Sequence, residues 1–169
     1  MGHSIVTFDE ASFRLVPVYK RVWFTKGETP KGVFFWSNKK LTIFGALIDG
    51  RKFFYEFYDA MNTVTFKSFI MSFVETLPPR KKFVFLLDNA GFHKTSPIAN
   101  YLRTFSRIKV EFFPPYCPEL NPTETCWKTI RQNVTNSTYF ENLDVMQESI
   151  ECFLESHFFM LEVSNYLCR

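Results

Sequence analysis

The 169-residue sequence predicts a single α/β domain, residues 1–169, in which helices flank a mixed five-stranded sheet. Three observations favour this fold class. An antiparallel hairpin is indicated over residues 41–58, apolar β-rich runs alternate with segments of helical periodicity after it, and 46% hydrophobic and 19% aromatic residues can fill a core. Strands that alternate with helices after a hairpin are typical of a mixed sheet covered by helices.

The first half of the chain predicts three strands and a long loop. A short β-rich run ends at Asp9, and residues 13–18 continue as a second extended piece. Residues 25–40 are rich in Gly, Lys, Pro and Thr, which is typical of a loop. The hairpin then turns at Asp49-Gly50, a dipeptide that favours a tight type I′ turn.

The second half predicts alternating helices and strands. Apolar residues at helical spacing end at Pro78-Pro79, and the run at 83–87 shows no alternation, as expected of a strand buried on both faces. The predicted elements, in chain order, are strands at 5–8, 41–48 and 52–58, a helix at 65–77, a strand at 83–87, a helix at 96–105, a strand at 108–113, and helices at 121–133 and 143–159.

Charge and cysteine content restrict the function only weakly. The net charge of +3 permits a nucleic-acid partner without indicating one, and the basic clusters at 39–40, 80–82 and 103–109 each read as solvated surface. The four cysteines form no C-x-x-C pair, so free thiols in a reducing compartment are expected. Neither a signal peptide nor an apolar run of about 18 residues is found, so we expect a cytoplasmic protein without a membrane partner.

Three carboxylates fall where the predicted sheet would bring them together. Asp9 follows the first strand, Asp88 follows the strand at 83–87, and Glu124 lies in the first turn of the helix after the last strand. Neighbouring parallel strands present their carboxyl ends at one edge of a sheet. Carboxylates at such a short separation repel each other unless a cation lies between them. Mg²⁺ and Mn²⁺ are hard cations that prefer such oxygen ligands. Two such ions can support phosphodiester chemistry.

Each acid also has a simpler interpretation. Asp9 fits a turn, and the Asp88-Asn89-Ala90-Gly91 segment is composed of turn-forming residues. Glu124 comes three residues after Asn121, which nearly forms a capping box. Spacing and strand order therefore leave the function open.

Two longer motifs favour one function. The segment LLDNAGFHKT, followed by FFPPYCPELNPTETCW, resembles the IS630 group of the IS630/Tc1/mariner transposase superfamily, which carries D-N-x-x-x-H and then P-x-Y-S-P-[DE]-L-N-P-x-E-x-x-W. The thirty-five residues between Asp88 and Glu124 are close to the spacing in that family. The segments FDE, WFTKG and LTIFGALIDG match as well, so the resemblance covers nearly the whole chain.

The resemblance implies an RNase H-like fold and a DDE catalytic domain. Asp9, Asp88 and Glu124 would be the catalytic metal ligands for two Mg²⁺ ions, which Mn²⁺ can replace, with Asp9 bridging both. Water would cleave DNA at the transposon end, and the released 3′-hydroxyl would attack target DNA, typically at a TA step. A homodimer on DNA is expected.

Two departures from the family pattern stand out. Cys117 occupies a position where the family usually has Ser. The helix-turn-helix domain that normally precedes the catalytic domain and binds the terminal repeats is absent from this sequence.

Four further residues are assigned roles near the acids. The imidazole of His93 either contacts the scissile phosphate or a ligand carboxylate, or caps a helix at the surface. Lys128 and Arg131 lie beyond Glu124 on the same helix and are candidate DNA-phosphate contacts, with solvated charge as the alternative. Trp127 is expected to pack in the core beneath the acids.

Two other functions compete with a transposase. One is a different nuclease of the same fold, such as an RNase H or a junction resolvase. The other is a domesticated or decayed transposase remnant that binds DNA without catalysis. The presence of all three acids argues against decay.

Overall fold

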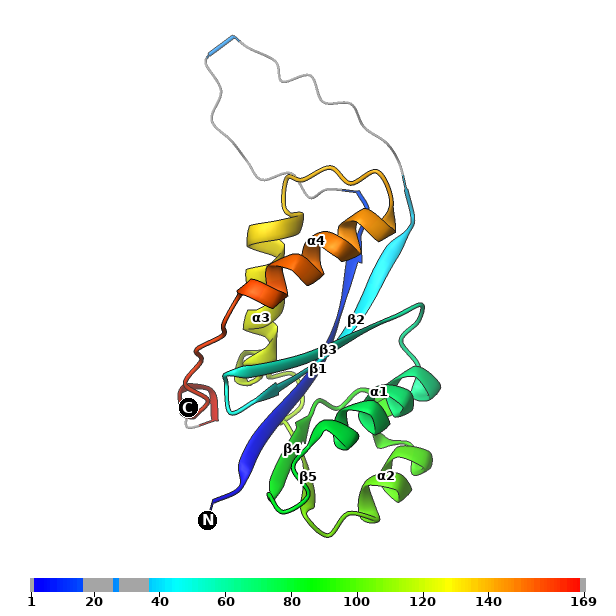
Figure 1. Cartoon of the computed structure of the whole chain (residues 1–169), viewed down its shortest axis with the longest axis vertical. Helices are drawn as coiled ribbons and strands as arrows, with labels where there is room; N and C mark the ends of the chain where they lie inside the picture. The colour runs from blue at the N-terminus through cyan, green and yellow to red at the C-terminus, as the bar shows by residue number, and fades with distance from the viewer. Residues whose placement is uncertain (1, 17–25, 28–36, 168–169) are drawn as a thin grey trace.

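The computed structural model describes residues 2–16, 26–27 and 37–167. Five strands form one mixed sheet in the order β3-β2-β1-β4-β5, as the sequence predicts (Figure 1). The strands are β1 (Ser4–Arg14), β2 (Lys40–Ile48), β3 (Lys52–Tyr58), β4 (Phe83–Leu87) and β5 (Ile108–Phe112). Strands β1, β2 and β3 pair antiparallel, whereas β1–β4 and β4–β5 are parallel.

Strand β1 is longer than predicted. It is one continuous strand, so the prediction that the first strand ends at Asp9 is wrong. Pairing with β4 stops at Thr7↔Leu86, but pairing with β2 continues to Arg14↔Lys40 and keeps the backbone extended past Asp9. Continued by two residues, the β1–β4 register places Asp9 level with Asp88. The prediction that these two strands are neighbours is therefore confirmed.

The β2–β3 hairpin has the predicted turn. Asp49 and Gly50 have φ values of 50° and 69°, the left-handed conformation at both central positions that a type I′ turn requires. The Asp49 carboxylate accepts hydrogen bonds from Ser4 Oγ at 2.6 Å and from the Ile5 amide at 2.8 Å, which ties the turn to the start of β1. A side chain at Gly50 would collide with the carbonyl of Leu161. The Leu161 amide donates a hydrogen bond to the Gly50 carbonyl and holds the two segments together.

Helices cover both faces of the sheet (Figure 1). The helices are α1 (Thr63–Thr76), α2 (Ser96–Arg103), α3 (Thr123–Ile130), α4 (Leu143–Ser156) and the short α5 (Ser164–Leu167). Helix α4 ends three residues before its predicted end because the chain turns extended at His157 and buries Phe159 against Phe53. A π-helical turn, Arg131–Thr135, extends α3, and 3₁₀ turns at Gly91–Lys94 and Pro118–Leu120 were not predicted.

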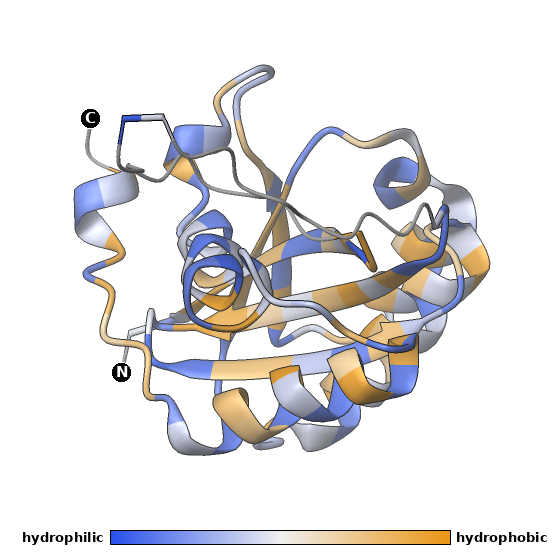
Figure 2. Cartoon of the chain, turned by 90° about the horizontal axis from the view of Figure 1, so that it is seen from above, coloured by the Kyte–Doolittle hydropathy of each residue, from blue (hydrophilic) through white to orange (hydrophobic). Residues whose placement is uncertain are grey.

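Strand β1 separates two hydrophobic clusters through its alternating side chains. Val6 and Phe8 pack with the aromatic face of α1, while Ala11 and Phe13 pack with Trp127 and the α3–α4 side. Figure 2 shows hydrophobic residues along the central strands between the helices. Alternation therefore places Asp9 on the α3 side of the sheet and its neighbour Glu10 on the α1 side.

Three other predictions concern features outside the sheet. The loop that begins at residue 25 lies mostly outside the described residues, as do Trp23 and Trp36. Cys117, Cys126 and Cys152 carry free thiols. No helix in the described parts of the chain is long and apolar enough to cross a membrane.

Candidate active site

The three predicted acids line one hollow in the surface. Asp9 comes from the middle of β1, Asp88 from the residue after β4, and Glu124 from the first turn of α3. The hollow has a volume of about 370 Å³, and the loop from Phe113 to Pro118 forms its opposite wall. Sheet order and register thus bring acids from three distant parts of the sequence to one place.

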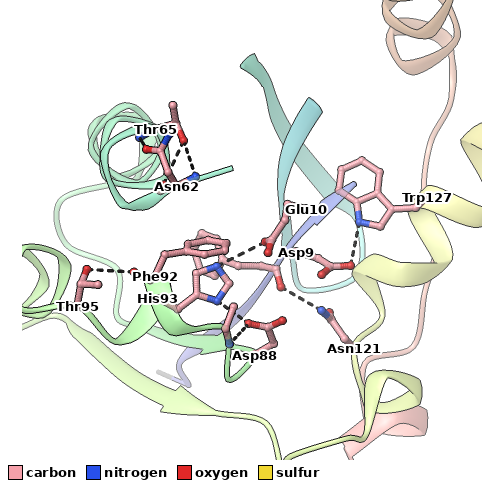
Figure 3. A network of polar contacts seen from close by, with 12 residues as sticks. Asp9, Glu10, Asn62, Thr65, Asp88, Phe92, His93, Thr95, Asn121 and Trp127 are labelled. Carbon is pink, nitrogen blue, oxygen red and sulfur yellow. Dashed lines mark hydrogen bonds and ion pairs between the residues drawn. The ribbon is translucent and has the colours of Figure 1, made fainter. Parts of the chain in front are cut away.

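Asp9 is a buried carboxylate with a single side-chain hydrogen-bond donor. It is 9% exposed, and the indole Nε1 of Trp127 donates to its Oδ2 at 2.9 Å (Figure 3). Burial, and then the nearby charges of Glu124 and Glu10, raise the pKa of Asp9 to about 8. The free energy cost of its negative charge is therefore high, and a bound cation would lower that cost.

Trp127 reaches Asp9 because a neighbouring strand position carries no side chain. Gly45 of β2 lies directly opposite Asp9 in the register, and a Cβ atom there would come within 2.7 Å of both the Phe53 and Trp127 rings. Glycine within a strand often marks such a close approach. Trp127 is 1% exposed, which confirms the predicted core position, but no local pattern predicts its hydrogen bond to Asp9.

The Asp88 carboxylate is held by two donors on one oxygen. Its Oδ1 accepts hydrogen bonds from His93 Nδ1 at 2.6 Å and from the Ala90 amide at 2.8 Å (Figure 3). Burial alone would raise the pKa of Asp88, but these two hydrogen bonds outweigh it and hold the pKa below its usual value. Asp88 is therefore an oriented, ionised carboxylate at neutral pH.

His93 connects Asp88 to a fourth acid that the sequence analysis did not select. Its side chain is fully buried, and Nε2 lies 3.5 Å from Glu10 Oε2 (Figure 3). The ring packs against Phe66 and Phe92, at centroid distances of 4.2 and 4.4 Å. Burial lowers the pKa of His93, but Asp88 and Glu10 outweigh it and raise the pKa to about 9, so the imidazolium form prevails at pH 7.

This burial decides among the interpretations of His93. A surface cap and a direct phosphate contact both need an accessible ring, and the His93 side chain is 3% exposed, so its burial favours neither. The remaining interpretation, a hydrogen bond to a ligand carboxylate, matches the contact with Asp88. The strand alternation of β1 was the available signal for Glu10, because it places this acid on the same face as Val6 and Phe8, where a carboxylate needs a partner.

Glu124 is half-buried, and the predicted near-capping box does not form. Helix α3 begins at Thr123 with no side-chain capping bond at its N-cap. Asn121 instead binds the Thr123 amide with its oxygen and donates from Nδ2 to the Phe8 carbonyl, which fixes the start of α3 against β1. The Glu124 side chain has no hydrogen bond to any residue in the described ranges and lines the hollow.

The two predicted DNA-phosphate contacts lie outside the hollow. Lys128 is exposed one turn beyond Glu124. The Arg131 guanidinium packs over the Phe13 ring at 5.1 Å from its centroid. Tyr116, which the sequence analysis did not select, does line the hollow and is fully exposed, with a φ of 60° in a proline-rich loop.

Comparison with known proteins identifies the family. A family described as DDE superfamily endonuclease matches residues 4–147. The chain belongs to this family. Two curated proteins are similar in sequence to this DDE chain. The Insertion element IS630 uncharacterized 39 kDa protein of Shigella sonnei is 22% identical over 155 residues, which cover 91% of the chain and 45% of that protein. The Uncharacterized protein y4pE/y4sA of Sinorhizobium fredii (strain NBRC 101917 / NGR234) is 38% identical over 61 residues, which cover 36% of the chain and 42% of that protein.

Solved structures of the Mos1 transposase have the same fold. The Mos1 strand transfer complex superposes with a TM-score of 0.73 at 18% identity, and covers 96% of this chain and 49% of the Mos1 chain. The catalytic domain of Mos1 gives a TM-score of 0.67 at 17% identity, and covers 92% of this chain and 71% of that one. These likenesses confirm the predicted RNase H-like fold class. The DDE chain spans about half the length of the curated relatives and of the Mos1 chain in the strand transfer complex.

The acidic side chains that line the hollow of this DDE domain have the chemistry that a divalent metal ion requires. The hollow offers the carboxylate oxygens of Asp9, Asp88 and Glu124, the ligand type that Mg²⁺ and Mn²⁺ prefer. The raised pKa of Asp9, caused partly by Glu124, shows that the hollow is electrostatically suited to a cation. Within the described ranges no three His, Cys, Asp or Glu side chains are gathered closely enough to hold an ion as they stand.

Proposed function

We propose that the chain is the catalytic domain of a DNA transposase that depends on divalent metal ions. The observation that carries the proposal is the convergence of Asp9, Asp88 and Glu124 on one hollow, together with the raised pKa of Asp9. The Mos1 structures support it, because they include a paired-end complex with the left transposon end and paired-end complexes with Mn and with Mg. Belonging to the DDE endonucleases supports cleavage of DNA.

In this proposal the three acids would hold two Mg²⁺ ions, for which Mn²⁺ can substitute. When bound, the ions supply activation of the attacking oxygen and stabilisation of the leaving oxygen. Trp127 and His93 orient the carboxylates of Asp9 and Asp88 through the hydrogen bonds described above, since partners of metal ligands fix ligand geometry.

The reaction would take place in two steps on DNA. Water attacks a phosphodiester at the transposon end, the P–O bond to the 3′ oxygen breaks, and a 3′-hydroxyl is released. That hydroxyl attacks a phosphodiester of target DNA at a TA step. The new P–O bond joins the two DNAs, while the P–O bond to the target's own 3′ oxygen breaks and releases a 3′-hydroxyl on the target. Lys128 and Arg131 would contact phosphates beside the hollow, although the packing of Arg131 on Phe13 limits its reach. A homodimer on DNA, acting on chromosomal DNA in the cytoplasm, completes the proposal.

Asp88→Asn tests this function. Nicking of supercoiled plasmid in Mn²⁺ and calorimetric Mn²⁺ titration would be measured for the wild type and for this variant, with circular dichroism as the folding check. We expect the variant to fold, to lose nicking, and to bind Mn²⁺ at least tenfold more weakly. Asp59→Asn, an exposed acid after β3, is the matched control and should behave as the wild type.

Two results would contradict the proposal. Full nicking by Asp88→Asn would remove Asp88 from the catalytic acids. A folded wild-type chain that binds DNA but never nicks it, in either metal, would favour a remnant without catalysis.

A further inference from the structure

Basic residues from three separate parts of the sequence meet at one edge of the sheet. Arg51 and Lys52 belong to the β2–β3 turn, Arg80, Lys81 and Lys82 precede β4, and Arg107 and Lys109 begin β5. The register aligns Lys52 with Ile48, Ser4 with Phe83, and Phe83 with Ile108. The β2–β3 turn and the first residues of β4 and β5 therefore lie at the same end of the sheet. We call these seven residues the basic edge. In the sequence its parts look like separate solvated clusters.

Packing on one aromatic ring holds part of the basic edge in place. Lys81 and Arg107 both lie over the Phe83 ring, at 5.9 and 5.8 Å from its centroid. Arg107 Nη1 also donates to the Pro78 carbonyl at 3.0 Å, and the Phe83 amide donates to the Arg107 carbonyl. The segments before β4 and β5 are therefore fastened to each other, and their charges have a fixed spacing.

Few acids neutralise this edge. Asp49 accepts hydrogen bonds from Ser4 and Ile5 and lies 3.7 Å from Lys81, and Glu111 pairs with Lys109 at 2.7 Å. The other five bases have no ion pair with any residue of the described ranges, and four of these five are exposed: Arg51, Lys52, Arg80 and Lys82. A hollow of about 440 Å³ lies between the turn and the β4 segment, with Arg51, Lys52 and Lys81 among its lining residues. The edge therefore presents unneutralised positive charge on both sides of a depression.

The dimensions of the basic edge suit an extended polyanion. It reaches from β3 to β5, four strand spacings of about 4.8 Å, or roughly 19 Å. Duplex DNA carries about one charge per 1.7 Å of its axis, so on the order of ten phosphates lie along this length. Phe83 and Asp88 are separated by five residues, so the edge lies about 16 Å from the acidic hollow, at the opposite end of the parallel strands.

We propose that the basic edge binds the sugar–phosphate backbone of duplex DNA at a site separate from the acidic hollow. The choice of DNA rests on the proposed function, which supplies a polyanion as the substrate. The contact is independent of base sequence and of metal ions, because it consists of Lys and Arg charges facing phosphates. The edge would hold a DNA segment while another segment occupies the hollow.

The salt dependence of DNA binding tests this proposal. Anisotropy of a labelled duplex of about 30 base pairs would be measured in EDTA between about 50 and 200 mM NaCl, where the logarithm of the association constant falls by about 0.9 per neutralised phosphate per decade of salt. R80Q/K82Q should make the slope shallower by about 1.8 and weaken binding about sixtyfold at 0.1 M salt. K39Q/K40Q removes the same charge at the other end of β2 and should leave the slope unchanged.

A second double variant protects the test against misfolding. R51Q/K52Q lies across the depression and should change the slope by the same amount, whereas circular dichroism should show the wild-type spectrum for both variants. An unchanged slope in folded R80Q/K82Q, or a wild-type chain that does not bind the duplex, would overturn the proposal. Because EDTA removes metal chemistry, this result is separate from plasmid nicking: intact nicking with an unchanged slope refutes only the basic edge.

Discussion

Replacing Asp9 with Asn should make the metal-free protein more stable, by an amount that increases with pH. The pKa of Asp9 is about 8 in the folded chain, against 3.8 for a free aspartate. Because the pKa of Asp9 is raised in the folded chain, protonation of this carboxyl group favours the folded state. The contribution is fully present below pH 3.8 and is lost as the pH rises towards about 8. Asn has the same shape, cannot ionise, and still offers an oxygen to the Trp127 indole.

The size of the effect follows from the pKa difference. Each unit is worth about 1.4 kcal/mol. Because the folded chain keeps the Asp9 proton that the unfolded chain releases above pH 3.8, Asp9 lowers the free energy of unfolding by roughly 1.6 kcal/mol at pH 5 and roughly 4 kcal/mol at pH 7. The charges of Glu124 and Glu10 contribute to this cost after burial, since both raise the pKa of Asp9. Asp9→Asn should therefore gain about 2.5 kcal/mol on the wild type between these two pH values.

Urea unfolding in EDTA at pH 5, 6 and 7 measures this difference directly. Taking the difference between variant and wild type removes the contribution of His93, whose raised pKa also makes the stability fall as the pH rises from about 6.5 through about 9. Added Mn²⁺ should stabilise the wild type more than Asp9→Asn, because the variant keeps only two of the three carboxylates that would hold the ions. Equal stabilities of the two proteins at all three pH values would refute the reasoning.

Two further substitutions test the residues that position the Asp9 carboxylate. Trp127→Phe keeps an aromatic ring but removes the indole donor, so it should lower the free energy of unfolding by about 2 kcal/mol and weaken Mn²⁺ binding tenfold or more. Phe53→Leu, which loses packing alone, is its control, and undiminished Mn²⁺ affinity in Trp127→Phe would speak against a positioning role. Gly45→Ala places a Cβ atom 2.7 Å from Phe53 and Trp127 and should cost about 1–3 kcal/mol, measured by urea unfolding, with loss of nicking. Wild-type stability and activity would show that Trp127 can shift without consequence.

The fold was predictable where local signals and tertiary structure agree. Strand β4 was predicted at its observed bounds because its apolar run stops at charged residues on both sides, and the β2–β3 turn because Asp49-Gly50 tolerates positive φ. The predicted end of β1 failed because Asp9 and Glu10 look like the polar end of a strand. They are instead acids in the middle of a sheet, where only partners remote in sequence make them tolerable.

The same limit explains the errors in the site and in α4. The motifs indicated Asp9, Asp88 and Glu124, and offered a ligand carboxylate as one partner of His93. They did not indicate the indole of Trp127 as the partner of Asp9, since a hydrogen bond across 118 residues has no local pattern. In α4 the aromatic run continued the helical period past Ser156. Exposed Phe158 beside buried Phe159 is the alternation of an extended chain.

The adjacent acids of β1 make the site sensitive to strand slippage. A shift of β1 by one residue against its neighbours would turn Glu10 towards the hollow and Asp9 towards His93, so that each acid met the partners of the other. Composition and net charge would not reveal such a misfolded form, which would still contain both carboxylates. Pairing with β2 on one side and β4 on the other specifies the alignment twice. Insertions or deletions between Ser4 and Asp9 should therefore be far rarer among active descendants of this chain than substitutions at the same positions.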